Sequence, residues 1–226
     1  MTGAVRFWGV IPAAGAGRRF GGPVPKQYLD LGGRRVIEHS IDALVAHPAI
    51  AGCVLALSPD DDWWPETCYA DHPRVQRVAG GAERSDSVAN ALTALDARAA
   101  EDDWILVHDA ARPCLTRVDL DRLVEALRDE PGGALLAVPV HDTVKTAAGL
   151  PLLRVEQTLP RHQLWRAFTP QAFRLGQLQL ALRQCQTLAL AITDDASAIE
   201  QLGLQPRLVE GRSDNIKITR PDDLPL

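Results

Sequence analysis

The sequence is poor in lysine, in aromatic residues and in long apolar runs. Only three of its 24 basic residues are lysines (Lys26, Lys145 and Lys217), and aromatic residues make up 5% of the chain. No apolar run approaches the ~18 residues that a membrane-spanning helix requires, so we expect no membrane partner. The first eight residues lack a charged segment followed by an apolar stretch, which predicts no secretory signal and a cytoplasmic location.

Paired cysteines and an excess of positive charge are also absent. The four cysteines lie far apart, at positions 53, 68, 114 and 185. This spacing argues against a disulfide framework or a zinc site and favours reduced thiols. The formal net charge is −5, whereas general nucleic-acid-binding proteins normally carry a basic face. We therefore expect no nucleic-acid partner.

Short apolar runs alternate with amphipathic segments over 226 residues, of which 46% are hydrophobic. Helical spacing of apolar residues predicts helices at 36–46, 85–97, 118–127, 175–186 and 195–202. Apolar runs predict strands at 7–11, 53–57, 75–78, 104–107 and 134–138, with a last strand at 215–219. The pattern indicates an α/β fold: a Rossmann-like, mostly parallel sheet with helices on both faces.

The segment from about 139 to 163 interrupts this alternation. Two β-like stretches, 143–146 and 152–155, flank Gly149 and predict a hairpin. The segment is too polar for a central core, so we expect it to project as an arm from a single domain that spans residues 1–226.

The loop after the first predicted strand is rich in small residues. Its sequence, PAAGAGRR at 12–19, allows backbone N–H groups to approach a ligand and cradle phosphate oxygens. Arg18, Arg19 and Lys26 add positive charge, although a tight solvated turn would have a similar composition. Phe20 stands where a dinucleotide-binding fingerprint requires glycine, and the Gly-Lys-Ser/Thr of a P-loop is missing.

Further short motifs follow this loop in a fixed order. They are PKQY (25–28), GGAERSDSV (80–88), VHDAARP (107–113), DTVK (142–145), LW (164–165), TPQ (169–171), TDDAS (193–197) and DNIK (214–217). Together they resemble the 2-C-methyl-D-erythritol 4-phosphate cytidylyltransferase family of sugar nucleotidyltransferases over essentially the whole chain. The resemblance implies transfer of CMP from CTP to methylerythritol phosphate in non-mevalonate isoprenoid biosynthesis, with release of pyrophosphate. It also implies Mg²⁺ or another divalent cation as the cofactor, and a homodimer in which the arm reaches across to the neighbouring subunit.

The same resemblance implies roles for individual residues. Arg19 and Lys26 would stabilise the pentacoordinate transition state, while Arg161 and Lys217 would align the attacking phosphate. The implied nucleotide-binding residues are Pro12, Ala13, Ala14, Gly15, Gly17, Gly81, Ser87, Asp109 and Ala110. The implied substrate-binding residues are Asp109, Arg112, Thr143, Arg161, Thr169, Thr193, Asp214 and Lys217. Ala82 stands where many relatives carry an acidic residue, which leaves only backbone contacts there.

Several acidic residues allow more than one interpretation. Asp109 directly follows a predicted strand, where α/β proteins bind ligands, and could face Mg²⁺ or a sugar hydroxyl. It could equally cap a helix or pair with Arg112. Asp214 could bond a hydroxyl or orient Lys217. We expect Asp194 and Asp195 to cap the following helix, and His108 to pack or bond to backbone rather than to titrate in catalysis.

Other functions stay open at the level of sequence. The chain could be a cytidylyltransferase for another polyol phosphate, such as ribitol 5-phosphate. It could also be a catalytically silent nucleotide-binding module, because a fold does not imply activity. A dinucleotide-dependent oxidoreductase is disfavoured by the glycine spacing.

Overall fold

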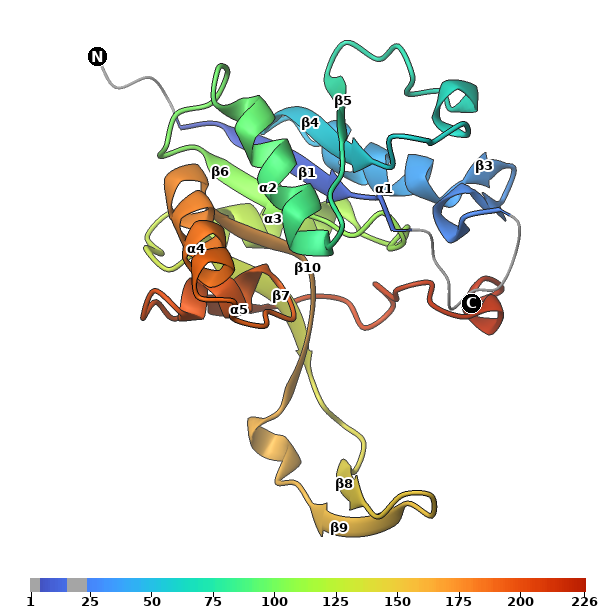
Figure 1. Cartoon of the computed structure of the whole chain (residues 1–226), viewed down its shortest axis with the longest axis vertical. Coiled ribbons are helices and arrows are strands. Elements are labelled where there is room, and N and C mark those ends of the chain that lie inside the picture. Colours follow the sequence, from blue (N-terminus) through green and yellow to red (C-terminus); the bar gives the residue numbers. More distant parts are fainter. Residues whose placement is uncertain (1–4, 16–23) are drawn as a thin grey trace.

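A seven-stranded sheet forms the centre of the computed structural model, which describes residues 5–15 and 24–226. The strand order is β11-β7-β10-β6-β1-β4-β5, and Figure 1 shows the sheet in the body of the molecule. The strands are β1 (Phe7–Pro12), β4 (Ile50–Leu57), β5 (Val75–Ala79), β6 (Trp104–Val107), β7 (Ala134–Pro139), β10 (Trp165–Arg174) and β11 (Arg207–Glu210). Only β10 runs antiparallel to its neighbours, β6 and β7. The mostly parallel sheet is as predicted.

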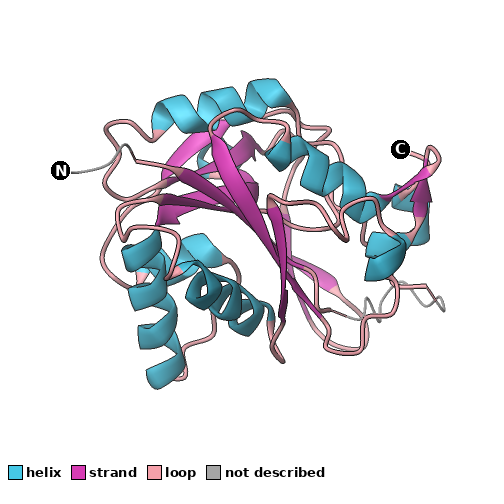
Figure 2. Ribbon diagram, turned by 90° about the horizontal axis from the view of Figure 1, so that it is seen from above, coloured by secondary structure: helices cyan, strands magenta, loops and turns pink. Residues whose placement is uncertain are grey.

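Helices cover both faces of the sheet (Figure 2). One core contains apolar residues of α1 (Val36–Val45) and α3 (Arg117–Ala126), packed with Leu55 and Leu106 of the sheet. The opposite core contains residues of α2, α4 and α5, packed with Trp8 and Val54. These helices span Arg84–Leu95, Leu175–Thr187 and Asp195–Glu200. Because alternate strand residues face the two cores, the strands are apolar on both sides, which explains their continuous apolar runs.

Small elements connect the main ones. They are the paired strands β2 (Asp30–Leu31) and β3 (Arg34–Arg35) and the short 3₁₀ helices Lys26–Tyr28, Trp64–Glu66, Arg161–Gln163 and Pro221–Asp223. All four cysteines are free thiols. Within residues 5–15 and 24–226, no helix has both the length and the apolar character needed to cross a bilayer.

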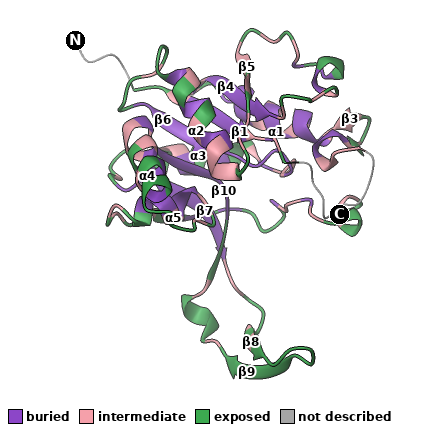
Figure 3. Ribbon diagram, viewed as in Figure 1, coloured by how far each residue is buried: buried purple, intermediate pink, exposed green. Residues whose placement is uncertain are grey.

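The predicted hairpin is present and extends well away from the sheet (Figure 1). Strands β8 (Lys145–Ala148) and β9 (Arg154–Thr158) pair with each other in antiparallel register and form a two-stranded sheet separate from the central one. The arm is exposed along nearly its whole length (Figure 3), including the apolar side chains of Leu150, Leu152 and Leu153.

The strand predicted at 215–219 is wrong. This segment, called the irregular strip below, has no regular secondary structure. Its Ile218 N–H donates to the Ala111 carbonyl (2.9 Å). The strand position beside β7 belongs instead to β11, which the sequence analysis did not predict. Strand β10 was also missed, because Thr169, Pro170 and Gln171 break its apolar pattern where its register with β7 shifts.

Candidate active site

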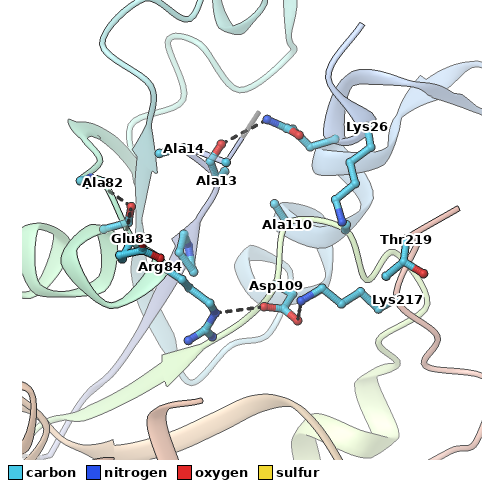
Figure 4. A pocket seen from close by; sticks show the side chains of 16 residues that line it. Ala13, Ala14, Lys26, Ala82, Glu83, Arg84, Asp109, Ala110, Lys217 and Thr219 are labelled. Atoms are coloured by element: carbon cyan, nitrogen blue, oxygen red, sulfur yellow. Dashed lines mark hydrogen bonds and ion pairs between the residues drawn. The ribbon is translucent and has the colours of Figure 1, made fainter. Parts of the chain in front are cut away.

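A pocket opens at the carboxyl ends of β1 and β6, which are parallel neighbours in the sheet (Figure 4). It is lined by Pro12, Ala13, Ala14, Gly15, Lys26, Gln27, Gly81, Ala82, Glu83, Arg84, Ser87, Asp109, Ala110, Ala111, Lys217 and Thr219. Eight of the nine residues predicted to bind nucleotide, all except Gly17, are therefore in this lining. Gly17 and Arg19 lie outside the described residues.

Glycine allows close packing at two positions beside the pocket. A Cβ on Gly80 would lie 2.3 Å from the Ala14 Cβ, and one on Gly81 would lie 2.2 Å from the Asp86 Cβ. The Gly81 N–H donates to the Ser87 hydroxyl (3.1 Å), which in turn donates to the Glu83 carbonyl (3.2 Å). The Ser87 hydroxyl thus shapes the loop that follows β5.

Asp109 is the buried acid of the pocket, and cations surround it. Its Oδ2 lies 2.9 Å from Lys217 Nζ and 3.2 Å from Arg112 Nε, and its Oδ1 lies 3.4 Å from Arg84 Nε. Burial alone would raise the pKa of the Asp109 carboxyl, but the charges of Lys217, Arg84 and Arg112 hold it well below its ordinary value. The carboxylate is therefore ionised and pairs with Arg112, while it also lines the pocket.

A hydrogen-bonded chain behind the pocket fixes the backbone at Asp109. The Asp109 N–H donates to Thr169 Oγ1 (3.0 Å), so this hydroxyl is left to donate to His108 Nδ1 (3.0 Å). His108 Nε2 then donates to the Arg112 carbonyl (3.1 Å). Burial lowers the pKa of His108 to about 4, in keeping with its predicted structural role. Thr169 is buried behind Asp109 and does not line the pocket.

The irregular strip at 215–219 closes the opposite side of the pocket. Lys26 Nζ donates to the Ile218 carbonyl (2.8 Å), and Arg112 Nη1 donates to the Asn215 carbonyl (2.8 Å). Asn215 Nδ2 donates to the Thr169 carbonyl (2.9 Å). These bonds place Lys217 opposite Asp109 (Figure 4), so segments distant in sequence meet at one edge of the sheet.

Arg84 and Asp195 were missed as members of the site. Asp194 caps α5 as predicted, since its Oδ1 accepts from the Ser197 N–H (2.9 Å). The capping prediction is wrong for Asp195, whose buried carboxylate lies 2.9 Å from Arg84 Nη2. In the sequence, the basic residue of the motif GGAERSDSV was the one available sign of Arg84. The pairing of residues 84 and 195 had no local sign, because the fold brings them together.

Of the predicted substrate-binding residues, only Asp109 and Lys217 are among the described residues that line the pocket of this single chain, and Arg112 reaches it through its ion pair with Asp109. Thr143, Arg161 and Thr193 are exposed, the first two on or beside the arm, and Arg161 Nη1 donates to the His141 carbonyl (2.6 Å). Asp214 pairs with Arg212 (2.9 Å from Nε to Oδ1) rather than with Lys217. The interpretation that Asp214 bonds a hydroxyl or orients Lys217 stays a prediction.

Lys26, Lys217 and Arg84 thus line the pocket, and Arg112 pairs with the pocket carboxylate of Asp109, an arrangement suited to a ligand with several phosphate groups. Its position is where open α/β sheets bind nucleotides. Fold and site together define an α/β nucleotidyltransferase.

The chain belongs to the 2-C-methyl-D-erythritol 4-phosphate cytidylyltransferase (IspD) family, whose family model matches residues 7–226. It is 57% identical over 219 residues to the Pseudomonas putida (strain GB-1) enzyme of that name, covering 96% of this chain and 92% of the relative. A solved 4-diphosphocytidyl-2C-methyl-D-erythritol synthase superposes with a TM-score of 0.83 at 38% identity, covering 99% of this chain and 96% of that one. The Francisella tularensis cytidylyltransferase also gives 0.83, at 36% identity and 97% coverage of both chains.

This membership confirms the resemblance seen in the sequence. The chain is a cytidylyltransferase that joins the CMP group of CTP to 2-C-methyl-D-erythritol 4-phosphate and releases pyrophosphate. The full-length match to one family favours this activity over that of a silent nucleotide-binding module or of an enzyme for another polyol phosphate.

Proposed function

We propose that the pocket between β1 and β6 holds both reactants, with the attacking phosphate between Lys217 and Arg112 and the α-phosphate of CTP near Lys26. The observation that carries this proposal is the position of Asp109, whose Oδ2 contacts both Lys217 and Arg112 (2.9 and 3.2 Å). A single carboxylate thereby holds two cations side by side, with Lys217 in the pocket lining and Arg112 next to it, where they can bind one phosphate group.

The reaction is a phosphoryl-type displacement. An oxygen of the methylerythritol phosphate forms a bond to the α-phosphorus of CTP, the bond to the bridging oxygen breaks, and pyrophosphate leaves with that electron pair. Both reactants are anions, so the site must offset their repulsion and the charge that develops on the equatorial oxygens. Lys26, together with Arg19, supplies that charge, while Lys217 and Arg112 align the attacking group.

The base and ribose of CTP are assigned to the opposite end of the pocket. Backbone groups at Gly81 and Ala82 line this end and can read the cytosine edge by hydrogen bonds. The Ser87 hydroxyl supports this loop from within. The loop Pro12–Gly15 is proposed to hold the triphosphate through its backbone N–H groups, as small residues permit.

Magnesium is proposed to enter with CTP. The described residues contain no group of three or more His, Cys, Asp or Glu side chains arranged as a metal site. Asp109 is an ionised carboxylate in the pocket, and a carboxylate has about four acceptor positions, so one remains beyond its three cations. This fits an ion held mainly by phosphate oxygens and water, as Mg²⁺ prefers. When bound, the ion would offset phosphate charge.

The arm is proposed to complete the site of a neighbouring subunit in a homodimer. Thr143 and Arg161 are exposed and absent from the pocket of their own chain, and the apolar side chains of Leu150, Leu152 and Leu153 are uncovered. Such a surface on a two-stranded hairpin needs a partner, because an isolated hairpin is marginally stable. Thr193 and the exposed Asp214 are proposed as further substrate contacts. The free thiols support a cytoplasmic location.

The test is a purified-protein assay with CTP, Mg²⁺ and either methylerythritol 4-phosphate or ribitol 5-phosphate. Pyrophosphate release and the mass of the product are measured in each case. We expect CDP-methylerythritol as the main product. Formation of CDP-ribitol without CDP-methylerythritol would contradict the proposal.

A further inference from the structure

Asp195 is a buried acid that the reaction as described does not use. It is the first residue of α5, is 1% exposed, and is absent from the pocket lining. Its carboxylate contacts Arg84 Nη2 at 2.9 Å. Arg84 itself begins α2 and does line the pocket. The ion pair therefore joins the start of α5 to the wall of the active site.

Arg84 lies between two carboxylates and contacts each with a different nitrogen. Nη2 faces Asp195, and Nε lies 3.4 Å from Asp109 Oδ1. The other oxygen of Asp109, Oδ2, faces Lys217 and Arg112. Acidic and basic side chains consequently alternate from Asp195 through Arg84 to Asp109 and on to the two cations proposed to hold the attacking phosphate.

The rigid guanidinium makes this arrangement directional. Because Asp195 takes Nη2, the planar guanidinium contacts Asp109 through Nε and does not bind that carboxylate with the paired Nε and Nη2 donors. Without Asp195, Arg84 would have one anionic partner in place of two and would be free to bind Asp109 through both oxygens. It would then compete with Lys217 and Arg112 for Oδ2. Buried ion pairs add little net stability, so stability alone does not account for this one.

We propose that Asp195 is a positioning residue for the transfer reaction, which holds Arg84 so that Asp109 presents Oδ2 to Lys217 and Arg112. The inference rests on the proposed function, in which these two cations bind the polyol phosphate. Its specific consequence concerns that substrate: loss of Asp195 should weaken the polyol phosphate subsite more than the CTP subsite.

The first experiment replaces Asp195 with asparagine, which keeps the size of the side chain and removes its charge. We expect the KM for methylerythritol phosphate to rise about tenfold, the scale of one charged hydrogen bond, with a much smaller change for CTP. Calorimetric titration with methylerythritol phosphate, in the presence of an unreactive CTP analogue, should show the same loss of affinity. Glu200→Gln, at the exposed end of the same helix, is the matched charge control.

A double variant separates positioning from a purely structural role. Arg84→Met with Asp195→Leu removes both charges, so neither remains buried without a partner and thermal stability should return toward that of wild type. The KM for methylerythritol phosphate should nevertheless stay high. Recovery of a normal KM together with stability would overturn the proposal, as would an unchanged affinity in Asp195→Asn. Failure of the wild-type protein to form CDP-methylerythritol would instead overturn the proposed function.

Discussion

At the scale of single residues, the scarcity of lysine proves informative. Two of the three lysines, Lys26 and Lys217, line the same pocket, although 191 positions separate them in the sequence (217 minus 26). The third, Lys145, lies on the exposed arm, where its Nζ donates to Thr158 Oγ1 (2.6 Å). Lysine offers a compact, rotatable charge, whereas arginine offers a rigid fork.

Substitutions of Lys26 test whether the reaction requires only a positive charge at this position or also the geometry of the lysine side chain. Lys26→Ala should lower kcat by about 10²–10³, the usual effect of removing one group that stabilises developing charge. Lys26→Arg keeps the charge but must replace the bond from Nζ to the Ile218 carbonyl, so we also expect a large loss in steady-state assays. Lys145→Ala is the control and should retain wild-type rates. A near-normal rate for Lys26→Ala would remove this lysine from the mechanism.

A substitution at Gly80 tests whether CTP binding requires the close approach of Gly80 to Ala14. Gly80→Ala places a Cβ where only 2.3 Å separates it from the Ala14 Cβ. One of the two residues has to move, so we expect the KM for CTP to rise by about an order of magnitude, the effect of losing one or two hydrogen bonds. Gly176→Ala on α4 is the control, since its Cβ would meet the Glu101 side chain at 3.3 Å, away from the pocket. Equal CTP kinetics in both variants would contradict this account.

At the scale of elements, the arm is the part to which we assign a role in the proposed homodimer. Its strands pair only with each other, and the links at its base are backbone bonds such as Val140 N–H to the Leu164 carbonyl (3.0 Å). Its apolar tip is exposed among the residues that the structure describes (Figure 3). The hairpin was predictable because alternating β-like stretches and a central glycine are local signals.

Mixing of inactive variants tests whether the arm acts across a dimer. Arg161→Ala and Lys26→Ala should each be nearly inactive alone. After unfolding and refolding together, mixed dimers would contain one site with an intact pocket from one chain and an intact arm from the other. We therefore expect part of the activity to return in the mixture, as measured by pyrophosphate release. If Arg161 served its own chain, mixing would restore nothing.

At the scale of the whole molecule, His108 links the stability of the fold to pH. Burial lowers its folded pKa to about 4, below the ordinary value of 6.5. Its neutral form therefore stabilises the folded chain fully above pH 6.5, and this contribution is lost as pH falls toward 4, because the unfolded chain binds the proton more readily. The loss should reach about 3 kcal/mol, at roughly 1.4 kcal/mol for each unit of pKa shift.

Denaturant unfolding between pH 7 and pH 4 measures this effect. The free energy of unfolding of His108→Gln should fall less steeply with decreasing pH than that of the wild type, whatever its absolute value. His162→Gln, at an exposed histidine near the base of the arm, should follow the wild-type curve. Parallel curves for His108→Gln and wild type would show that His108 does not contribute to the pH dependence.

The sequence by itself determined the layered α/β fold, the hairpin and the segments that build the pocket. These follow from local signals: apolar runs at strand and helix spacing, small residues after β1, and short motifs whose order matches one family. The helix at 36–46 and the strand at 104–107 correspond to α1 and β6 within a residue at either end. Such patterns can be recognised without knowledge of the fold, because they depend on residues that are close together in the sequence.

The tertiary structure alone decided how these segments meet. Strand β10 inserts antiparallel between β6 and β7, which places Thr169 behind Asp109. The irregular strip at 215–219 carries Lys217 to Asp109, although its apolar pattern had predicted a strand. Asp195 pairs with Arg84 across 111 positions of sequence (195 minus 84). The physical reason is that a buried charge must find an opposite charge in space, and a local pattern contains no information about which distant residue supplies it.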